Sequence, residues 1–439
     1  MTVANALPPM VSGGLPLVGL GPEFMRNPER VFQRGLDEHG ETFRMRVFGN
    51  DTVVMLGAEN SWVFFHSKNF STQGATPFFE KMFSPGFYSL ASESEYRRQQ
   101  RVLIPLFQRA QISGFIPTIE AVTDAFLESL GEKGEFDLTA EFGPLVFRIA
   151  STCFLGEQVA QEMGADFYRE FRNFSDGMTF IPRWVKTPRN VRSQRAAVRL
   201  KSALGAMIER RRTRPLAEPD FLQQLVTQRY EDGTPVPDDI LVNMVLLLAW
   251  AGYETTAGQL AWTLTDLLLE SGTLARAREE ADRIVKDGSL DRAAVDRMTV
   301  LTACMKESEN QHSIAPMLAR RVTADTQVGE YLIPEGTLVL AAPAQTHRMT
   351  DGLNCPFGYA PDRFLGEDGK ANLNSLIGFG AGTHRCLGKP FAEAEMLVIL
   401  CRVLAGFELE LTTGTPRPTP GATGTKWPAA PVRVAYRRR

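Results

Sequence analysis

The feature that most constrains the fold is one long apolar stretch with helical periodicity. Pro237, Asp238 and Asp239 mark its start, because proline and acidic residues favour the first turn of a helix, and the pattern runs to Ser271 and Gly272. At about 1.5 Å per residue, such a helix spans roughly 50 Å. A helix this long and this apolar must cross the core of the protein.

Between about residues 95 and 310, apolar residues recur at three- and four-residue spacing, which predicts helices. Short runs with alternating polarity predict strands on either side of this region. The sequence therefore predicts a mainly α protein with small β-sheets, in the α+β class. The predicted strands are 43–47, 52–56, 326–332, 337–342 and 432–436, and the predicted turns between paired strands are 49–51 and 334–336.

The charge balance excludes one class of partner. The 439 residues include 48 Lys and Arg against 51 Asp and Glu, for a formal net charge of -3. A nucleic-acid-binding protein usually carries a strong basic field, so nucleic acid is not an expected partner. The length allows either several domains of about 150 residues or one large helical domain.

The N-terminal segment 1–25 is rich in proline and glycine and lacks both an early basic cluster and a long apolar run. It reads as neither a signal peptide nor a membrane anchor. No segment reaches the ~20 consecutive apolar residues of a membrane span, and the most apolar stretch, 244–252, is about half that length. These features predict a cytoplasmic protein without a membrane anchor.

The five cysteines are odd in number, widely separated and without a C-x-x-C pair, which argues against a disulfide framework and against a zinc ribbon. Cys153, Cys304 and Cys401 lie in apolar helical runs and are expected to pack in the core. Cys355 lies in a predicted loop, and its role is left open. Only Cys386 has neighbours that suggest chemistry.

Glycines surround Cys386 at positions 380, 382 and 388, and a helical run over 390–405 follows. Glycines let the backbone approach a flat ligand, and a helix start offers free N–H groups and a positive dipole end that stabilise a thiolate. Such a thiolate suits a nucleophile, a redox thiol or a metal ligand, and an ordinary buried cysteine is also possible. The local residues do not separate these alternatives.

The wider pattern F-x-x-G-x-x-x-C-x-G, from Phe379 to Gly388, resembles the haem-binding signature of the cytochrome P-450 family. The resemblance implies the P-450 fold, with the long helix crossing a haem b whose iron is bound by the Cys386 thiolate. It also implies that Phe379 packs near the sulfur and that His384 meets a haem propionate. The cofactor-binding residues implied by the resemblance are Tyr96, Gln100, Ala251, Gly252, Arg320, Phe379, Gly380, His384, Cys386 and Gly388.

A carboxylate and hydroxyls interrupt the long apolar helix at Glu254 and Thr255. Polar groups there are costly without partners, and they could reach solvent or bond back to the i-4 carbonyl. The A-G-x-E-T-T segment also resembles the distal segment of the same family. By that resemblance both residues are catalytic: Thr255 would hydrogen-bond the activated dioxygen and Glu254 would relay protons, which favours a monooxygenase over a peroxygenase.

Two positions depart from the family pattern. Asn310 stands where the E-x-x-R motif has arginine, so Glu307 is expected to pair with Arg363 alone, and haem retention or stability is expected to suffer. Gln100 stands where relatives often have arginine or histidine. The arginines expected to face solvent near this position are Arg97, Arg98 and Arg101.

Aromatic side chains predict a hydrophobic small-molecule substrate, although about half of them are expected to fill core contacts. Those predicted to line the substrate pocket are Phe78, Phe79, Phe83 and Phe87. Further aromatics in the region resembling the lid helices are Phe167, Tyr168, Phe171, Phe174 and Phe180.

Residues 1–439 are expected to form a single haem domain without a fused reductase, because flavin, nicotinamide and iron–sulfur signatures are absent from the sequence. Electrons would come from a ferredoxin or flavodoxin with its reductase. The docking face is expected near Cys386 and would include Arg97, Arg98, Arg109 and Lys389.

The leading hypothesis is a soluble bacterial-type haem-thiolate monooxygenase that uses dioxygen to hydroxylate or epoxidise a hydrophobic small molecule, in secondary metabolism. A second hypothesis keeps the haem but assigns oxidative coupling, rearrangement or dehydration. A third, motivated by Asn310, is a degenerate ligand-binding protein without turnover.

Overall fold

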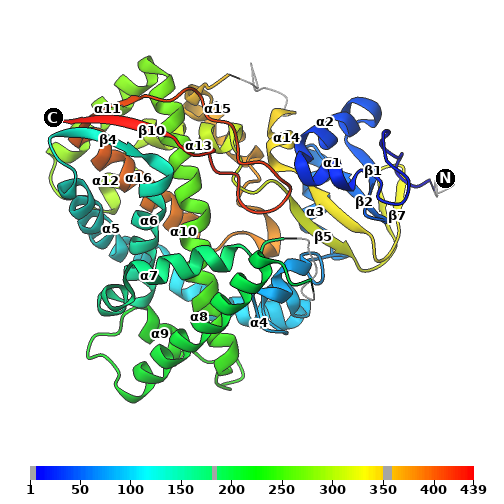
Figure 1. Ribbon diagram of the computed structural model, residues 1–439, viewed down its shortest axis with the longest axis horizontal. Helices are drawn as coiled ribbons and strands as arrows, with labels where there is room; N and C mark the ends of the chain where they lie inside the picture. Colours follow the sequence, from blue (N-terminus) through cyan, green and yellow to red (C-terminus); the bar gives the residue numbers. More distant parts are fainter. Residues whose placement is uncertain (1–5, 180–184, 350–357) are drawn as a thin grey trace.

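A computed structural model describes residues 6–179, 185–349 and 358–439 (Figure 1). Its α-helices are α1 (Gly21–Arg26), α2 (Pro28–His39), α3 (Ala58–His66), α4 (Glu93–Leu103), α5 (Arg109–Ser129), α6 (Leu138–Leu155), α7 (Glu157–Ser175), α8 (Pro188–Thr213), α9 (Phe221–Thr227), α10 (Asp238–Leu269), α11 (Ser271–Lys286), α12 (Arg292–Asp296), α13 (Thr299–Gln311), α14 (Pro343–Arg348), α15 (Gly366–Ser375) and α16 (Lys389–Gly406). Short 3-10 helices are η1 (Pro77–Lys81), η2 (Tyr88–Leu90), η3 (Ile104–Phe107), η4 (Pro361–Phe364) and η5 (Gly382–His384).

The strands form small sheets, as the sequence predicts. One sheet has the order β1-β2-β8-β5-β3, a second β4-β10-β9, and a third pairs β6 with β7. The strands are β1 (Thr42–Val47), β2 (Asn50–Met55), β3 (Phe70–Ser71), β4 (Lys133–Asp137), β5 (Leu318–Val322), β6 (Thr326–Val328), β7 (Tyr331–Ile333), β8 (Leu338–Ala341), β9 (Phe407–Leu411) and β10 (Arg433–Arg438).

The predicted N-terminal strand pair is confirmed, with β1 antiparallel to β2 and Val47 opposite Asn50. The single strand expected over 326–332 is wrong, because the chain turns at Gly329, whose φ is 55°, and gives the hairpin β6–β7. Strand β8 instead joins β2 and β5 in the larger sheet. The sequence analysis did not identify β3, β4, β5 or β9.

The predicted central helix is confirmed as α10, which crosses the helical part of the molecule (Figure 1). Helices α6 and α10 are both long and apolar enough to cross a membrane by length and composition, contrary to the prediction that no segment qualifies. In each apolar window, 72% and 67% of the residues respectively are buried inside the protein. Both helices therefore pack as core helices in this structure.

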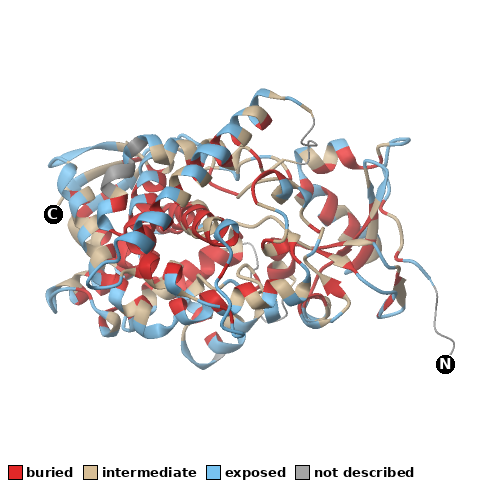
Figure 2. Ribbon diagram, turned by 90° about the horizontal axis from the view of Figure 1, so that it is seen from below, coloured by how far each residue is buried: buried red, intermediate tan, exposed pale blue. Residues whose placement is uncertain are grey.

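Buried residues concentrate where α5, α6, α10 and α16 pack together (Figure 2). Smaller apolar clusters lie on the two faces of the five-stranded sheet, one beneath α1 and α2 and the other beneath α3. The helical part and the sheet thus form two ends of the molecule (Figure 1). Residues from both ends contribute to the site described next.

Candidate active site

The segment around Cys386 forms a tight turn that depends on two glycines. Gly380 and Gly382 have φ angles of 67° and 64°, which other residues rarely adopt. A Cβ at Gly382 would lie 2.5 Å from the main-chain oxygen of Phe65, so a larger residue does not fit. The main-chain N–H of Cys386 donates to the oxygen of Phe379 at 2.9 Å and closes the turn. Helix α16 begins directly afterwards.

Cys386 is exposed, but dense protein on its remaining sides limits its hydration. This burial raises the pKa of the Cys386 thiol, while the N–H groups of Gly388 and Lys389 and the charge of Lys389 lower it. The groups at the helix start therefore act in the direction that favours a thiolate, as expected, and burial acts against them. A neutral thiol is a poor nucleophile, whereas a coordinated cation deprotonates it. The metal-ligand alternative fits best.

Within the described ranges, His, Cys, Asp and Glu form no group of three or more that could hold a metal ion. A porphyrin brings its own nitrogen ligands to iron, so one protein thiolate suits a haem. The glycine turn provides the close backbone approach that a flat macrocycle needs. At Gly388, a Cβ would lie 3.9 Å from the Cys386 sulfur, so this glycine borders the ligand atom itself.

Tyr96, His384 and Arg320 come together beside the Cys386 turn from three separate elements. The rings of Tyr96 in α4 and His384 in η5 lie 4.4 Å apart between centroids. Arg320 in β5 is close enough for its charge to act on both groups. His384 Nε2 also contacts Glu93 Oε2 at 3.2 Å. The structure thus brings these three predicted cofactor residues together.

Arg320 is a buried charge without an acidic partner among the described residues. Its side chain donates to the neighbouring Ala319 oxygen at 2.9 Å, and burial lowers its pKa. Burial, followed by the charge of Arg320, lowers the pKa of His384 to about 4, and His384 Nδ1 is buried without a hydrogen-bond partner. A ligand carboxylate would balance this cluster. Haem propionates therefore fit.

Gln100 is used by the protein itself. Its Nε2 donates to the main-chain oxygen of Thr383 at 2.8 Å and lies 3.4 Å from the Tyr96 hydroxyl, so it connects α4 to the Cys386 turn. The neighbouring arginines face the surface, as predicted. They pair with acids there: Arg97 with Glu93, Arg98 with Asp232, and Arg101 with Glu231.

The A-G-x-E-T-T segment lies within α10, and its members point to different neighbours. Thr255 is exposed although the residues that follow it are buried, and its Oγ1 donates to the Ala251 oxygen at 2.9 Å. This back-bond leaves the hydroxyl oxygen free to accept a further hydrogen bond. At Gly252, a Cβ would lie 3.2 Å from Phe154, so this glycine faces α6. Any cofactor contact by Gly252 would involve its backbone.

The carboxylate of Glu254 is held between two hydroxyl groups. Ser175 Oγ, at the end of α7, donates to its Oε2 at 3.0 Å, and Thr425 Oγ1 donates to its Oε1 at 3.0 Å. Trp427 Nε1 donates to the main-chain oxygen of Glu254 at 3.0 Å. Glu254 therefore does not simply reach solvent, because α7 and the C-terminal segment both fix it.

Two lysines lie near the Phe379 ring. The Nζ atoms of Lys306 and Lys389 are 5.2 and 5.4 Å from the ring centroid, a range that allows cation–π attraction. Lys306 is buried and paired with Glu309 and Glu393. The carboxylates of Glu309 and Glu393 balance the charges of the two lysines.

The pairing of Glu307 with Arg363 is confirmed, with 3.0 Å between Oε2 and Nε. Asn310 is buried, and its Oδ1 has no hydrogen-bond partner. Gln311, one helical turn beyond Glu307, instead donates from Nε2 to Glu307 Oε1 at 2.9 Å. A neutral amide thus occupies the third place in the buried network. Burial still raises the pKa of Glu307 against these two partners.

Asn310→Arg is expected to stabilise the protein, because a second guanidinium near Glu307 would compensate its buried charge. A hydrogen bond to a charged group contributes about 1–2 kcal/mol, so the melting temperature should rise by a few degrees and haem should be lost more slowly. Thermal unfolding and haem transfer to apomyoglobin measure both quantities. An unchanged melting temperature and haem occupancy would count against this role for Asn310.

His347 makes the stability depend on pH. The ring is fully buried, its Nε2 accepts from the Ile377 N–H at 2.9 Å, and burial lowers its pKa to about 4. The unfolded chain binds this proton near pH 6.5, so stability falls as pH drops from 6.5 towards 4, by about 2 kcal/mol between pH 7 and pH 5. In urea unfolding, His347→Gln should flatten this dependence. An equal slope in both proteins would contradict it.

The predicted pocket aromatics divide into two groups. Phe78 and Phe79 are half-buried, whereas Phe83 and Phe87 are 4% and 2% exposed and pack in the core. Trp250 on α10 joins them, with its ring 6.3 Å from Phe79 and 6.1 Å from Phe83. Of the lid aromatics, Phe167 and Tyr168 are half-buried, Phe171 and Phe174 are fully buried, and Phe180 lies outside the described residues.

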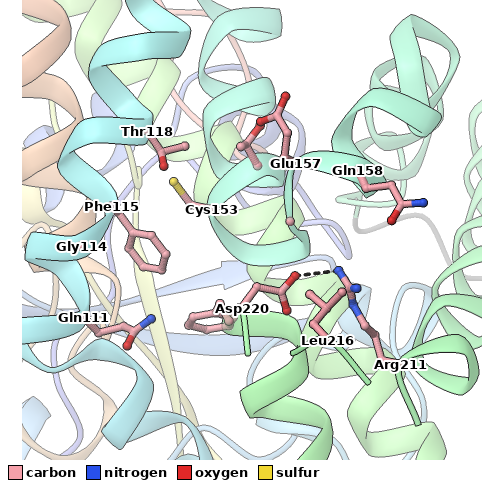
Figure 3. A pocket seen from close by; sticks show the side chains of 13 residues that line it. Gln111, Gly114, Phe115, Thr118, Cys153, Glu157, Gln158, Arg211, Leu216 and Asp220 are labelled. Carbon is pink, nitrogen blue, oxygen red and sulfur yellow. Dashed lines mark hydrogen bonds and ion pairs between the residues drawn. The ribbon is translucent and has the colours of Figure 1, made fainter. Parts of the chain in front are cut away.

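A cleft of about 460 Å³ lies elsewhere, where α5, α6, α7 and α9 meet the end of α8 (Figure 3). The ion pair Arg211–Asp220 crosses it, with 2.6 Å between Nη2 and Oδ2, and Phe115 and Cys153 line it. None of the predicted site residues lines this cleft. It is therefore separate from the candidate active site.

The other cysteines behave largely as expected. Cys153, Cys304 and Cys401 are buried, and burial raises the pKa of each thiol. They are core residues rather than reactive groups. Cys355 lies outside the described residues.

Sequence reasoning missed several residues that contact the site. Ser175 and Thr425 come from distant segments, and no sequence signal links them to Glu254. Gln311 and Trp250 did have a signal, because each lies four residues from a motif residue on the same helix. Tyr88 is half-buried with a φ of 50°, and its ring lies 5.6 Å from that of Tyr96.

Comparisons with known proteins agree with this geometry. A family model described as cytochrome P450 matches residues 8–434. Obtusifoliol 14-alpha demethylase of Sorghum bicolor is 28% identical over 425 residues, which cover 93% of this chain and 86% of that protein. Sterol 14alpha-demethylase of Mycobacterium tuberculosis is 27% identical, covering 92% of each chain. Lanosterol 14-alpha demethylase of Homo sapiens is 26% identical, covering 98% and 87%.

Among solved structures, the retinoic acid-bound cyanobacterial CYP120A1 superposes with a TM-score of 0.90 at 24% sequence identity. The alignment covers 99% of this chain and 100% of that one. The predicted fold is thereby confirmed.

Proposed function

Because the chain belongs to the cytochrome P450 family and is a haem-thiolate monooxygenase, we propose that it hydroxylates or epoxidises a hydrophobic small molecule of secondary metabolism. Cys386 is the proposed iron ligand, and Arg320, Tyr96 and His384 are the proposed propionate contacts. When bound, the haem supplies dioxygen activation and the transfer of one oxygen atom to the substrate. The other oxygen atom is reduced to water, with two electrons from a redox partner and two protons from solvent.

The observation that carries this proposal is the exposed hydroxyl of Thr255 beside the doubly held carboxylate of Glu254. Thr255 Oγ1 donates to the Ala251 oxygen and can accept a hydrogen bond from a donor such as water. It can therefore anchor a chain of hydrogen-bonded waters at Thr255. Glu254, the residue immediately before Thr255, can take up and release the proton. The pair gives α10 a polar position inside an otherwise apolar helix.

Thr255→Ala tests the proposal. The variant should bind haem and substrate normally but divert most consumed dioxygen to hydrogen peroxide. Product per dioxygen should fall by at least about tenfold, because a positioned proton-transfer group contributes roughly 10²–10⁴-fold to the step it serves. Product and peroxide are measured with a surrogate redox pair under ¹⁸O₂. Unchanged coupling would contradict the role of Thr255. A product without ¹⁸O would favour coupling, rearrangement or dehydration chemistry instead.

A sterol or related polycyclic lipid is the second candidate substrate, because the relatives named above act on sterols and match over more than nine-tenths of this chain. Identities of 26–28% leave room for a different substrate. The two candidates are separated by titrating sterols and smaller aromatic or terpenoid compounds and recording the shift in haem spin state. A compound that enters the proposed site would be recognised by this shift.

The proposed electron donor is a ferredoxin or flavodoxin, which its reductase supplies with electrons. The chain itself is proposed to be a single haem domain located in the cytoplasm. Of the predicted docking cations, Arg97, Arg98 and Arg109 are engaged in surface ion pairs. Lys389, 38% exposed beside the Cys386 turn, is more loosely paired, with 3.9 Å between its Nζ and Glu393 Oε1. Electrostatic docking there requires that the reduction rate fall as salt rises, and a salt-independent rate would argue against it.

A further inference from the structure

We propose that Ser175 is a positioning residue for Glu254, and that Trp250 fixes Ser175 in turn. The inference rests on the proposed function, because it assigns a role to the neighbours of the proton-relaying acid. Ser175 is the last residue of α7, whereas Trp250 and Glu254 lie one turn apart on α10. Ser175 therefore joins the proposed lid to the helix that carries the catalytic pair.

Four groups surround the Ser175 hydroxyl. The Trp250 Nε1 lies 2.8 Å away, Glu254 Oε2 at 3.0 Å, the Phe171 oxygen at 3.2 Å and the Tyr253 hydroxyl at 3.4 Å. An indole N–H only donates, so Ser175 Oγ accepts from Trp250. The Ser175 proton is then left for Glu254, the Phe171 oxygen or the more distant Tyr253 hydroxyl.

Glu254 is the better acceptor of that proton. Its distance to Ser175 is shorter than that of the Phe171 oxygen, and a hydrogen bond to a carboxylate is stronger than one to a carbonyl. The Trp250 N–H keeps the hydroxyl oriented, because it occupies one lone pair and leaves the proton directed at Glu254. If α7 moved away, Ser175 would keep its bond to Phe171 within its own helix and lose its contacts with Trp250, Tyr253 and Glu254 of α10.

The indole of Trp250 also contacts the predicted substrate-side aromatics. Its ring lies 6.3 Å from Phe79, 6.1 Å from Phe83 and 5.9 Å from Phe174, all edge-on. Trp250 is 7% exposed, so a shift of these rings cannot leave it unaffected. The packing of Phe79, Phe83 and Phe174 and the placement of Glu254 are therefore linked through the Trp250 indole and the Ser175 hydroxyl.

A second hydrogen bond to the Glu254 carboxylate comes from a different segment. Thr425, in the C-terminal segment, donates to the other carboxylate oxygen, Oε1, at 3.0 Å. Ser193 on α8 provides the matched control, since its buried hydroxyl bonds the Phe174 oxygen at 3.0 Å. Ser193→Ala therefore loosens the contact between the two proposed lid helices, as a merely structural change would, without touching Glu254.

The experiment compares Ser175→Ala, Ser175→Thr and Ser193→Ala with the parent holoenzyme. Ser175→Ala should lower product per dioxygen consumed by about fivefold with substrate Kd unchanged within twofold, because one charge-assisted hydrogen bond is lost. Ser175→Thr, which restores the hydroxyl, should recover coupling, and Ser193→Ala should retain it. Equal uncoupling in Ser175→Ala and Ser193→Ala, or no uncoupling in Ser175→Ala, would overturn the inference.

A second measurement needs no turnover. In ultraviolet resonance Raman spectra of the ferric protein, Ser175→Ala should shift the indole N–H marker of one of the five tryptophans towards the unbonded position. The shift should vanish in a Trp250→Phe background. An unchanged marker in Ser175→Ala would overturn the Trp250–Ser175 link. If Ser175→Ala shifts the marker but the parent oxidises no tested substrate, the result counts against the proposed function only.

Discussion

Cys386→Ala is expected to lose thiolate ligation and to lower monooxygenase turnover by at least about a thousandfold, equivalent to roughly 4 kcal/mol in the barrier. The reason is that Cys386 is the exposed cysteine of the described residues, held by the Gly380–Gly382 turn, with the N–H groups of Gly388 and Lys389 directed at its sulfur. Alanine keeps the turn but removes the ligand atom. Activity and the absorption spectrum of the purified variant measure the effect.

Cys153→Ala is the matched control. Cys153 is 4% exposed in α6 and packs in the core, so its loss should cost about 1 kcal/mol of stability and leave the haem spectrum unchanged. Retained thiolate spectrum and turnover in Cys386→Ala would show that another group binds the iron.

Glu307→Ala is expected to destabilise the protein by about 3–5 kcal/mol, because it leaves the guanidinium of Arg363 buried without its carboxylate. Glu307 is fully buried and the Arg363 side chain is 8% exposed, with 3.0 Å between their charged atoms. The Gln311 amide would also lose its acceptor. Urea unfolding at pH 7 gives the free energy difference.

The neighbouring pair Arg276–Asp362 serves as the control, because its side chains are 46% and 67% exposed. Asp362→Ala should cost less than about 1 kcal/mol, as surface ion pairs do. If both variants lost the same stability, the buried network would not hold the proximal side of this fold together.

The Cys386 turn could be predicted because its chemistry is local. Glycine positions and the helix start lie within one short segment, and their conformations follow from residue type alone. The same holds for the length and course of α10, whose apolar pattern is continuous. The electrostatics of the thiol could not be predicted in the same way, because burial depends on segments distant in the chain.

The hydrogen-bond partners of Glu254 likewise could not be predicted from the sequence. Ser175 precedes it by 79 residues and Thr425 follows it by 171, so their convergence depends on how α7 and the C-terminal segment pack. Gln311 was within reach, since a glutamine four residues after Glu307 lies on the same helix face.

The central claim is that Cys386 binds a haem iron as a thiolate. The most direct measurement is the difference spectrum of the reduced protein with carbon monoxide, recorded for the parent and for Cys386→Ala. Thiolate ligation produces a strongly red-shifted Soret band, which is expected in the parent and is expected to be absent in the variant. A parent without this band, or a variant that retains it, would contradict the claim.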